Sequence, residues 1–283
     1  MTTHGGKPIG VAWLFSLARS GSSITAYAAA HAAGAAVADE VLGPWDRTVP
    51  PYSYPTAQAA LARSFKVSRA RLTGEIARDL AALLDELAHR AGTDRVVSKH
   101  PHLRFTPDEL TDRFPDHAAA WLIRNPLKRL ASIHARGWTS IVRPNHDLEF
   151  FREYAERWLD TPEQQRLIFE DLRRDPAAYF AALFSAWEWP ADDATIARAV
   201  AYQRSSYHGA SGQIEPHRSA SAGLSDTSRT APREAVDLYL NDPFMQNLFQ
   251  TCGWSLSRAD YLPTFRQRVA RRVRRSLARG AGS

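Results

Sequence analysis

The longest apolar run of the chain, Ile9–Leu17, leads directly into the turn ARSGSS and then into a stretch of small residues. The run is too short to span a bilayer. Because it is apolar throughout, it fits a strand of a parallel sheet that is covered on both faces. A buried strand followed by a glycine turn and a helix is typical of α/β proteins. This junction constrains the fold more than any other feature of the sequence.

The same order of strand and helix recurs along the chain. We therefore predict a three-layer, P-loop-like α/β fold, in which helices flank a central parallel sheet. One domain is expected over residues 1–264, followed by a basic tail over 265–283. The predicted strands are Ile9–Leu17, Arg95–Lys99, Ala118–Arg124 and Arg166–Phe169. The predicted helices are Gly21–His31, Val67–Arg90, Pro126–Trp138, Leu148–Leu159, Pro176–Trp187, Thr195–Gln203, Arg233–Leu240 and Phe244–Cys252.

Charge and cysteine content exclude several classes of protein. The formal net charge is +6, but seven arginines lie between Arg266 and Arg279 with no acid among them. The rest of the chain is therefore close to neutral, which argues against a nucleic-acid-binding protein with a basic folded face. Cys252 is the only cysteine, so no intramolecular disulfide framework can form. These features predict a cytoplasmic protein.

The basic tail has an amphipathic pattern. Its apolar residues Phe265, Val269, Val273 and Leu277 recur every four residues, with arginines between them. Such a helix can lie on an anionic membrane surface or bind an acidic partner. It can equally pack its apolar stripe against its own domain. Both interpretations stay open, and the first adds peripheral contact with a membrane to the expected localisation.

The first turn, Arg19–Ser23, has the composition of an anion-binding site. A helix N-terminus offers backbone N–H groups and the positive end of the helix dipole. Gly21 lets the backbone approach a ligand closely, while Arg19 and the serines add donors. The phosphate-loop pattern GxxxxGK[ST] is absent, because the turn contains no lysine. A serine-rich helix start without a ligand is the alternative.

A second junction, WLIRNPLKRLAS, again places a strand before a helix that begins with proline. Arg124 ends the strand, and Ser132 follows about two helical turns later. Both side chains can therefore reach one phosphate. The alternative is an ordinary junction with a surface arginine.

Ligands of parallel sheets bind beyond the carboxyl ends of the strands. We expect the segments that follow the predicted strands to be neighbours in space. They are Ser16–Ser23, Lys99–His102, Arg124–Ser132 and Glu170–Asp175.

These two junctions, in this order, resemble the sulfotransferase superfamily. FEDLRRDP resembles a further strand and helix of that family, and KHPHL resembles a strand end that is common in its bacterial members. The resemblance implies 3′-phosphoadenosine-5′-phosphosulfate (PAPS) as the sulfuryl donor and no required metal. It implies that the first turn holds the 5′-phosphosulfate, that Arg124 and Ser132 hold the 3′-phosphate, and that Phe169 packs near adenine. Ala18 and Ile24 depart from the family pattern, which has proline and, in some members, tryptophan there.

The resemblance implies an enzyme that moves a sulfuryl group to the hydroxyl of a small molecule, lipid or carbohydrate. Arg19 and Lys99 would neutralise charge on the leaving phosphate. Glu40 is the first candidate for the general base and His102 the second. A P-loop kinase-like phosphotransferase, or a non-catalytic nucleotide-binding protein on the same fold, are the alternatives.

Overall fold

The computed structural model describes residues 3–4, 7–8, 10–39, 74–100, 114, 117–135, 144–208, 214–216 and 230–263. The chain divides into two compact units. The first unit contains residues 1–123 and 158–224, and the second contains 124–157 and 225–283. The prediction of a single domain over residues 1–264 stays a prediction, and the tail over 265–283 lies outside the described residues.

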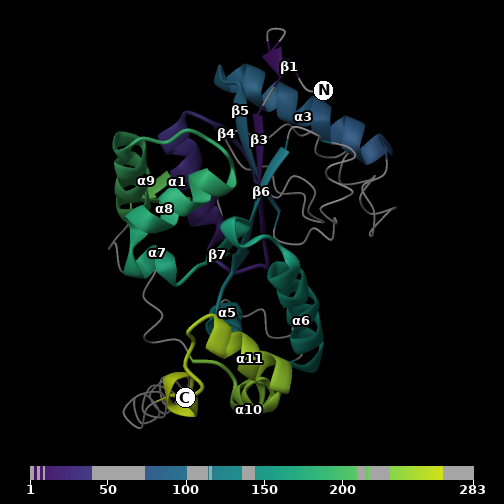
Figure 1. Cartoon of the computed structure of the whole chain (residues 1–283), viewed down its shortest axis with the longest axis vertical. Helices are drawn as coiled ribbons and strands as arrows, with labels where there is room; N and C mark the ends of the chain where they lie inside the picture. The colour runs from purple at the N-terminus through teal and green to yellow at the C-terminus, as the bar shows by residue number, and fades with distance from the viewer. Residues whose placement is uncertain are drawn as a thin grey trace, which may run out of the picture. The chain divides into compact units, whose positions relative to one another are not determined.

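The first unit is built around a parallel sheet (Figure 1). Within the described residues this sheet has five strands in the order β4-β5-β3-β6-β7, and every neighbouring pair is parallel. The predicted parallel α/β sheet is therefore confirmed. The edge strand β4 was not predicted, because four residues carry too little periodicity. The strands are β3 Gly10–Ser16, β4 Ala36–Asp39, β5 Arg95–His100, β6 His117–Ile123 and β7 Arg166–Ile168.

Strand register brings the carboxyl ends of these strands to one edge of the sheet. On β3, Phe15 pairs with His100 of β5, and Ser16 pairs with Leu122 of β6. On β6, Ile123 pairs with Ile168 of β7. Because β3 lies between β5 and β6, the first turn leaves the sheet at the middle of this edge.

Helices cover both faces of the sheet, as the predicted three layers require. Helices α1 (Ser22–Ala33), α8 (Pro176–Ala186) and α9 (Asp193–Ser205) lie on one side, and α3 (Gly74–Ala91) lies on the other (Figure 1). Alanines of α1 share one buried cluster with Leu14 of β3 and Phe180 of α8. Small side chains let α1 pack close to the sheet. The other elements of this unit are β1 Thr3–His4, β2 Lys7–Pro8, η2 Glu163–Gln165, α7 Asp171–Arg174, β8 Ser206–His208 and β9 Ile214–Pro216.

Hydrogen bonds from side chains far along the sequence fix α1 and the sheet. The indole of Trp187 donates to the Trp13 carbonyl at 3.0 Å, which ties the end of α8 to the middle strand. Helix α1 ends at Gly34, which has a φ of 66°, a left-handed conformation that favours glycine at the end of a helix. The Arg198 guanidinium donates to the Ala32 carbonyl at 3.1 Å, so a cation lies at the negative end of the α1 dipole.

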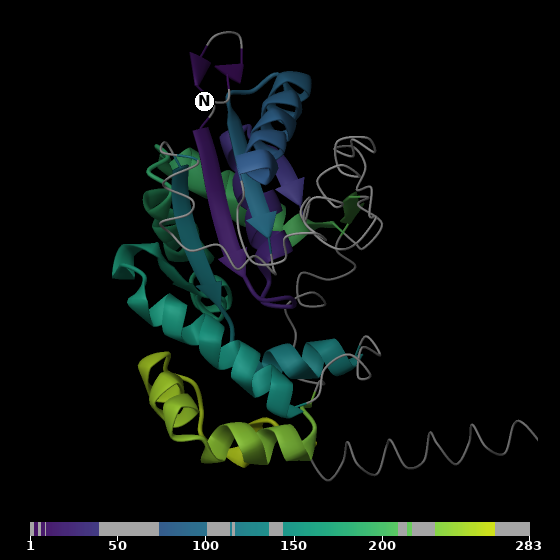
Figure 2. The same ribbon diagram turned by 90° about the vertical axis from the view of Figure 1, so that its right-hand side faces the viewer.

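The second unit is helical (Figure 2). Two of its helices begin with proline and have a side-chain cap directly before it. The Asn125 side chain accepts a hydrogen bond from the Leu127 amide of α5, and the Asp242 side chain accepts one from the Met245 amide of α11. This arrangement follows from proline's preference for the first helical position and from the capping ability of Asn and Asp. Its elements are α5 Pro126–Ala135, α6 Pro144–Asp160, whose last turn belongs to the first unit, α10 Arg233–Asn241, α11 Pro243–Thr251 and η3 Arg258–Asp260.

Within the described residues, no helix combines the length and the apolar character needed to cross a membrane.

Candidate functional site

The first turn is backbone-strained. The Ser20 amide donates to the Leu17 carbonyl at 3.2 Å, which closes a tight turn over Leu17–Ser20. In this turn Arg19 has a φ of 70°, a left-handed conformation that non-glycine residues rarely adopt. Gly21 also has a positive φ, 89°. Residues held in such conformations cluster at ligand-binding and catalytic sites, and turns of this kind form concave anion-binding surfaces.

Gly21 is required by close packing as well as by its φ. A Cβ atom added here would lie 1.9 Å from Cε2 of Phe169. The Phe169 ring therefore lies directly against the backbone of the first turn. Phe169 is buried and belongs to the same core cluster as α1. No residue with a side chain fits at position 21 unless this ring moves.

Helix α1 begins without a side-chain cap. Its N-cap is Gly21, which has no side chain to accept from the first amides of the helix. The amides of the first turn of α1 therefore point beyond the start of the helix, and the positive end of the helix dipole lies at the same place. This is the local geometry that binds phosphate and sulfate at helix N-termini.

Lys99 brings a buried positive charge to the same place. The residue is 1% exposed, and its ammonium donates to the Ser23 hydroxyl at 3.0 Å. Because Lys99 pairs with Leu14 on β3, both side chains project from the face that α1 covers. The structure thus brings together the predicted residues Arg19–Ser23, Lys99 and Phe169 at the carboxyl edge of the sheet. The predicted packing of Phe169 near adenine stays a prediction.

The second predicted junction lies at the start of the second unit. Asn125, not Arg124, is the N-cap of α5: its Oδ1 accepts from the amides of Leu127 and Lys128 at 3.1 Å each. The N-terminus of α5 is thus closed, in contrast to that of α1. A phosphate bound here would depend on side chains such as Arg124 and Ser132, which are 8% and 1% exposed. That these two residues share a ligand with the first turn stays a prediction.

Both candidates for the general base, Glu40 and His102, lie outside the described residues. Glu40 follows directly in sequence on the strand that was not predicted, β4, which ends at Asp39. In the register of the sheet, Asp39 pairs with Lys99. Strand β4 therefore ends level with Lys99.

A buried polar group in the second unit was missed by the sequence analysis. Arg129 of α5 forms an ion pair with Asp147 of α6, and the Tyr239 hydroxyl of α10 donates to the other carboxylate oxygen of Asp147 at 2.7 Å. Burial lowers the pKa of Arg129 and is the largest single effect, but the charge of Asp147, the contribution of Tyr239 and the hydrogen bonds to both together outweigh it, so the pKa is raised. Burial and the Asp147 charge together raise the pKa of Tyr239 well above its usual value. No local pattern could reveal this group, because 18 and 92 residues separate the partners.

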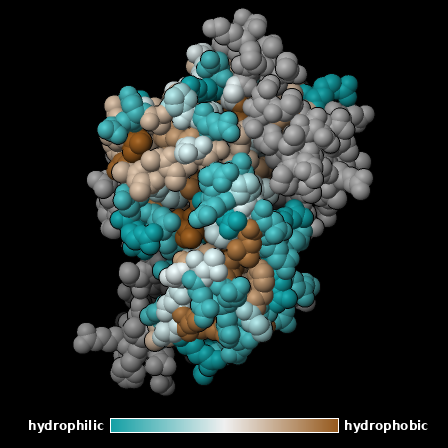
Figure 3. All heavy atoms as spheres, in the orientation of Figure 1, coloured by the Kyte–Doolittle hydropathy of each residue, from teal (hydrophilic) through white to brown (hydrophobic). Residues whose placement is uncertain are grey.

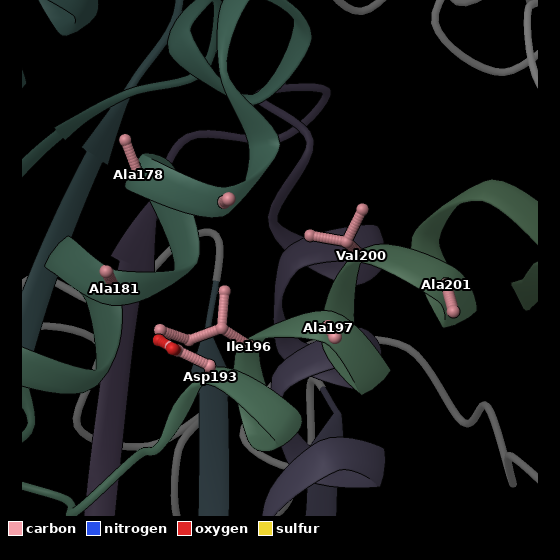
Figure 4. Close-up of a pocket in the computed structure, with 8 residues that line it drawn as sticks. Ala178, Ala181, Asp193, Ile196, Ala197, Val200 and Ala201 are labelled. Atoms are coloured by element: carbon pink, nitrogen blue, oxygen red, sulfur yellow. The ribbon is translucent and has the colours of Figure 1, made fainter.

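A shallow groove of about 640 Å³ lies elsewhere in the first unit, between α8 and α9. Figure 4 shows the alanine side chains and Val200 that line it, and Figure 3 shows the pale brown patch over these helices. None of the predicted site residues lines this groove. It is therefore separate from the candidate site.

The contact between Gly21 and Phe169 can be tested by a double-mutant cycle. Gly21→Ala combines a Cβ collision with a strained φ, so we expect it to lower the free energy of unfolding by roughly 2–5 kcal/mol. In a Phe169→Leu background, which removes the ring atoms nearest the new Cβ, the same substitution should cost at least about 1 kcal/mol less. Urea unfolding of the four proteins measures the coupling. An equal cost in both backgrounds would show that the ring does not constrain the turn.

The charge of Lys99 can be separated from its packing. Lys99→Met keeps most of the side-chain volume and removes a charge that is expensive to bury, so the free energy of unfolding should change by less than about 2 kcal/mol. Inorganic sulfate should bind about tenfold more weakly, because a charge near the anion is lost. Titration of sulfate against thermal stability measures both. Arg78→Met, on the exposed surface of α3, is the control and should leave sulfate binding unchanged.

Comparison with known proteins agrees with the observed fold. No protein-family profile and no curated protein sequence matches the chain. The sulfotransferase domain from the curacin biosynthetic pathway matches with a TM-score of 0.50 and 14% identity, over 89% of this chain and 100% of that domain. A sulfotransferase from Alicyclobacillus acidocaldarius matches with a TM-score of 0.45 and 14% identity, over 88% of this chain and 97% of its own. Mouse sulfotransferase SULT7A1, complexed with PAP, matches with a TM-score of 0.43 and 11% identity, over 86% of this chain and 82% of its own. The resemblance predicted from the two junctions is therefore confirmed at the level of architecture: the chain has the fold of the sulfotransferases.

Proposed function

We propose that the protein is a sulfotransferase that moves a sulfuryl group from PAPS to a hydroxyl acceptor. One observation carries the proposal: on this fold, the first turn is held in a strained conformation at an uncapped helix start, with the buried ammonium of Lys99 beside it. Strain, an open helix N-terminus and a buried cation all favour an anion at the same point.

The donor would be held by the residues that the sequence resemblance implies. The amides and hydroxyls of residues 20–23 would bind the 5′-phosphosulfate, with Arg19 and Lys99 supplying positive charge. Arg124 and Ser132 would bind the 3′-phosphate, and Phe169 would support the adenine. The donor supplies the activated sulfuryl group, and the protein supplies position and charge.

In the proposed reaction the acceptor oxygen attacks sulfur in line with the leaving phosphate. The bond between sulfur and the bridging oxygen breaks as the new sulfur–oxygen bond forms, and negative charge develops on the leaving phosphate. Donors aimed at that charge lower the barrier, as they do in phosphoryl transfer. The acceptor proton passes to Glu40 or, as the second candidate, to His102.

Ligand-dependent stability tests the proposed donor. At about one hundred times its dissociation constant, 3′,5′-adenosine bisphosphate should stabilise the protein by about 2.7 kcal/mol and raise its melting temperature by roughly 5–10 °C. Mg-ATP should give no comparable shift. Stabilisation by Mg-ATP alone would favour the phosphotransferase alternative, and no response to either ligand would contradict the proposal.

The predicted base is tested separately from the donor site. Glu40→Gln keeps the shape of the side chain but cannot accept the proton, so kcat should fall roughly 100-fold or more while the affinity for 3′,5′-adenosine bisphosphate stays unchanged. Product formation from PAPS is measured over a panel of sugar, lipid and small-molecule alcohols. If Glu40→Gln retains full turnover and His102→Gln loses it, His102 is the base instead.

A further inference from the structure

We propose that Asp147 and Tyr239 are positioning residues for the 3′-phosphate, acting through Arg129 on helix α5. The inference rests on the proposed function, because it concerns the helix that begins after Arg124 and contains Ser132. It assigns a role to the C-terminal segment 230–263, in which the sequence shows no recognisable motif.

The three residues form one buried polar group across three helices. Arg129 is 3% exposed and pairs with Asp147, while the guanidinium also lies over the Phe151 ring at 5.7 Å. Asp147 uses its other oxygen to accept from Tyr239, whose ring meets Phe151 edge to face at 6.1 Å. Charge, hydrogen bond and ring packing therefore hold α5, α6 and α10 at one point.

This group fixes the part of α5 that carries Ser132, one of the two residues proposed to bind the 3′-phosphate. Ser132 lies three residues after Arg129, so the two are neighbours on the helix surface. Arg124 lies just before the cap of the same helix. With Arg129 fixed by Asp147, α5 cannot rotate or slide without breaking a buried ion pair. A misplacement of about 1 Å is enough to reduce catalysis about 100-fold.

A second contact holds the start of the same helix. The side-chain Nδ2 of Asn125, the cap of α5, donates to the Tyr261 hydroxyl at 3.0 Å, and that hydroxyl donates to the Ser255 carbonyl at 2.6 Å. The Ala231 amide donates to the Tyr261 carbonyl, which joins the two ends of the C-terminal segment. Residues 230–263 thus contact the cap of α5 through Tyr261. They also reach Arg129 of α5 through the hydrogen bond between Tyr239 and Asp147.

The test measures how much the 3′-phosphate contributes to binding. Dissociation constants of 3′,5′-adenosine bisphosphate and adenosine 5′-monophosphate are compared by calorimetry on the full chain. We expect native protein to prefer the bisphosphate roughly 100-fold, because charge-assisted contacts are strong. Asp147→Asn should reduce this ratio about tenfold and Tyr239→Phe about threefold, with the affinity for the monophosphate unchanged.

A matched control separates positioning from general stability. Arg152→Gln breaks the ion pair between α6 and Asp242 at the start of α11, and Arg152 forms no hydrogen bond or ion pair with Arg129, Asp147 or Tyr239, which we call the Arg129 group. It should lower stability without changing the ratio. An unchanged ratio in both Asp147→Asn and Tyr239→Phe would overturn the inference, as would an equal loss of affinity for both ligands. Native protein without any preference for the bisphosphate would instead contradict the proposed function.

Discussion

The structure depends on one close contact, between the backbone of Gly21 and the ring of Phe169. This contact joins the end of β7 to the start of α1, and it requires a residue without a side chain at the point where the chain leaves the sheet. Because the cap is a glycine, the first amides of α1 receive no hydrogen bond from a capping side chain. The same packing constraint thus both seats the helix on the sheet and leaves its N-terminus available to an anion.

The sequence analysis interpreted the starts of α1 and α5 as similar anion-binding junctions, but the two are chemically different. Helix α1 is uncapped and has a buried ammonium beside it, whereas the amides of α5 are already bonded to Asn125. An anion at α1 can be bound by backbone amides, but one near α5 must rely on side chains. Asp147 and Tyr239 fix α5 through Arg129, as the proposed positioning role requires.

Sequence alone predicted four strands of the parallel sheet and the first turn closely, because buried parallel strands are apolar throughout, and it predicted the start of α5 from Pro126. It missed β4 and the two-stranded sheets β1–β2 and β8–β9, because two to four residues are too few to show a period. It also missed the Arg129 group, because Asp147 and Tyr239 are far apart in sequence and each resembles an ordinary helical residue. Lys99 was recognised as a strand-end lysine, but neither its burial nor its bond to Ser23 could be deduced.

The sequence by itself determined the fold class and the chemical character of the first turn, since local hydrophobic period, proline and glycine act within a few residues. Tertiary structure decided which of the marked residues meet. It placed the Phe169 ring against Gly21 and the Lys99 ammonium within hydrogen-bond distance of Ser23. It also placed Asp147 between Arg129 and Tyr239. These contacts join strands and helices that are distant in the chain, and only packing of the folded elements brings such partners within bonding distance.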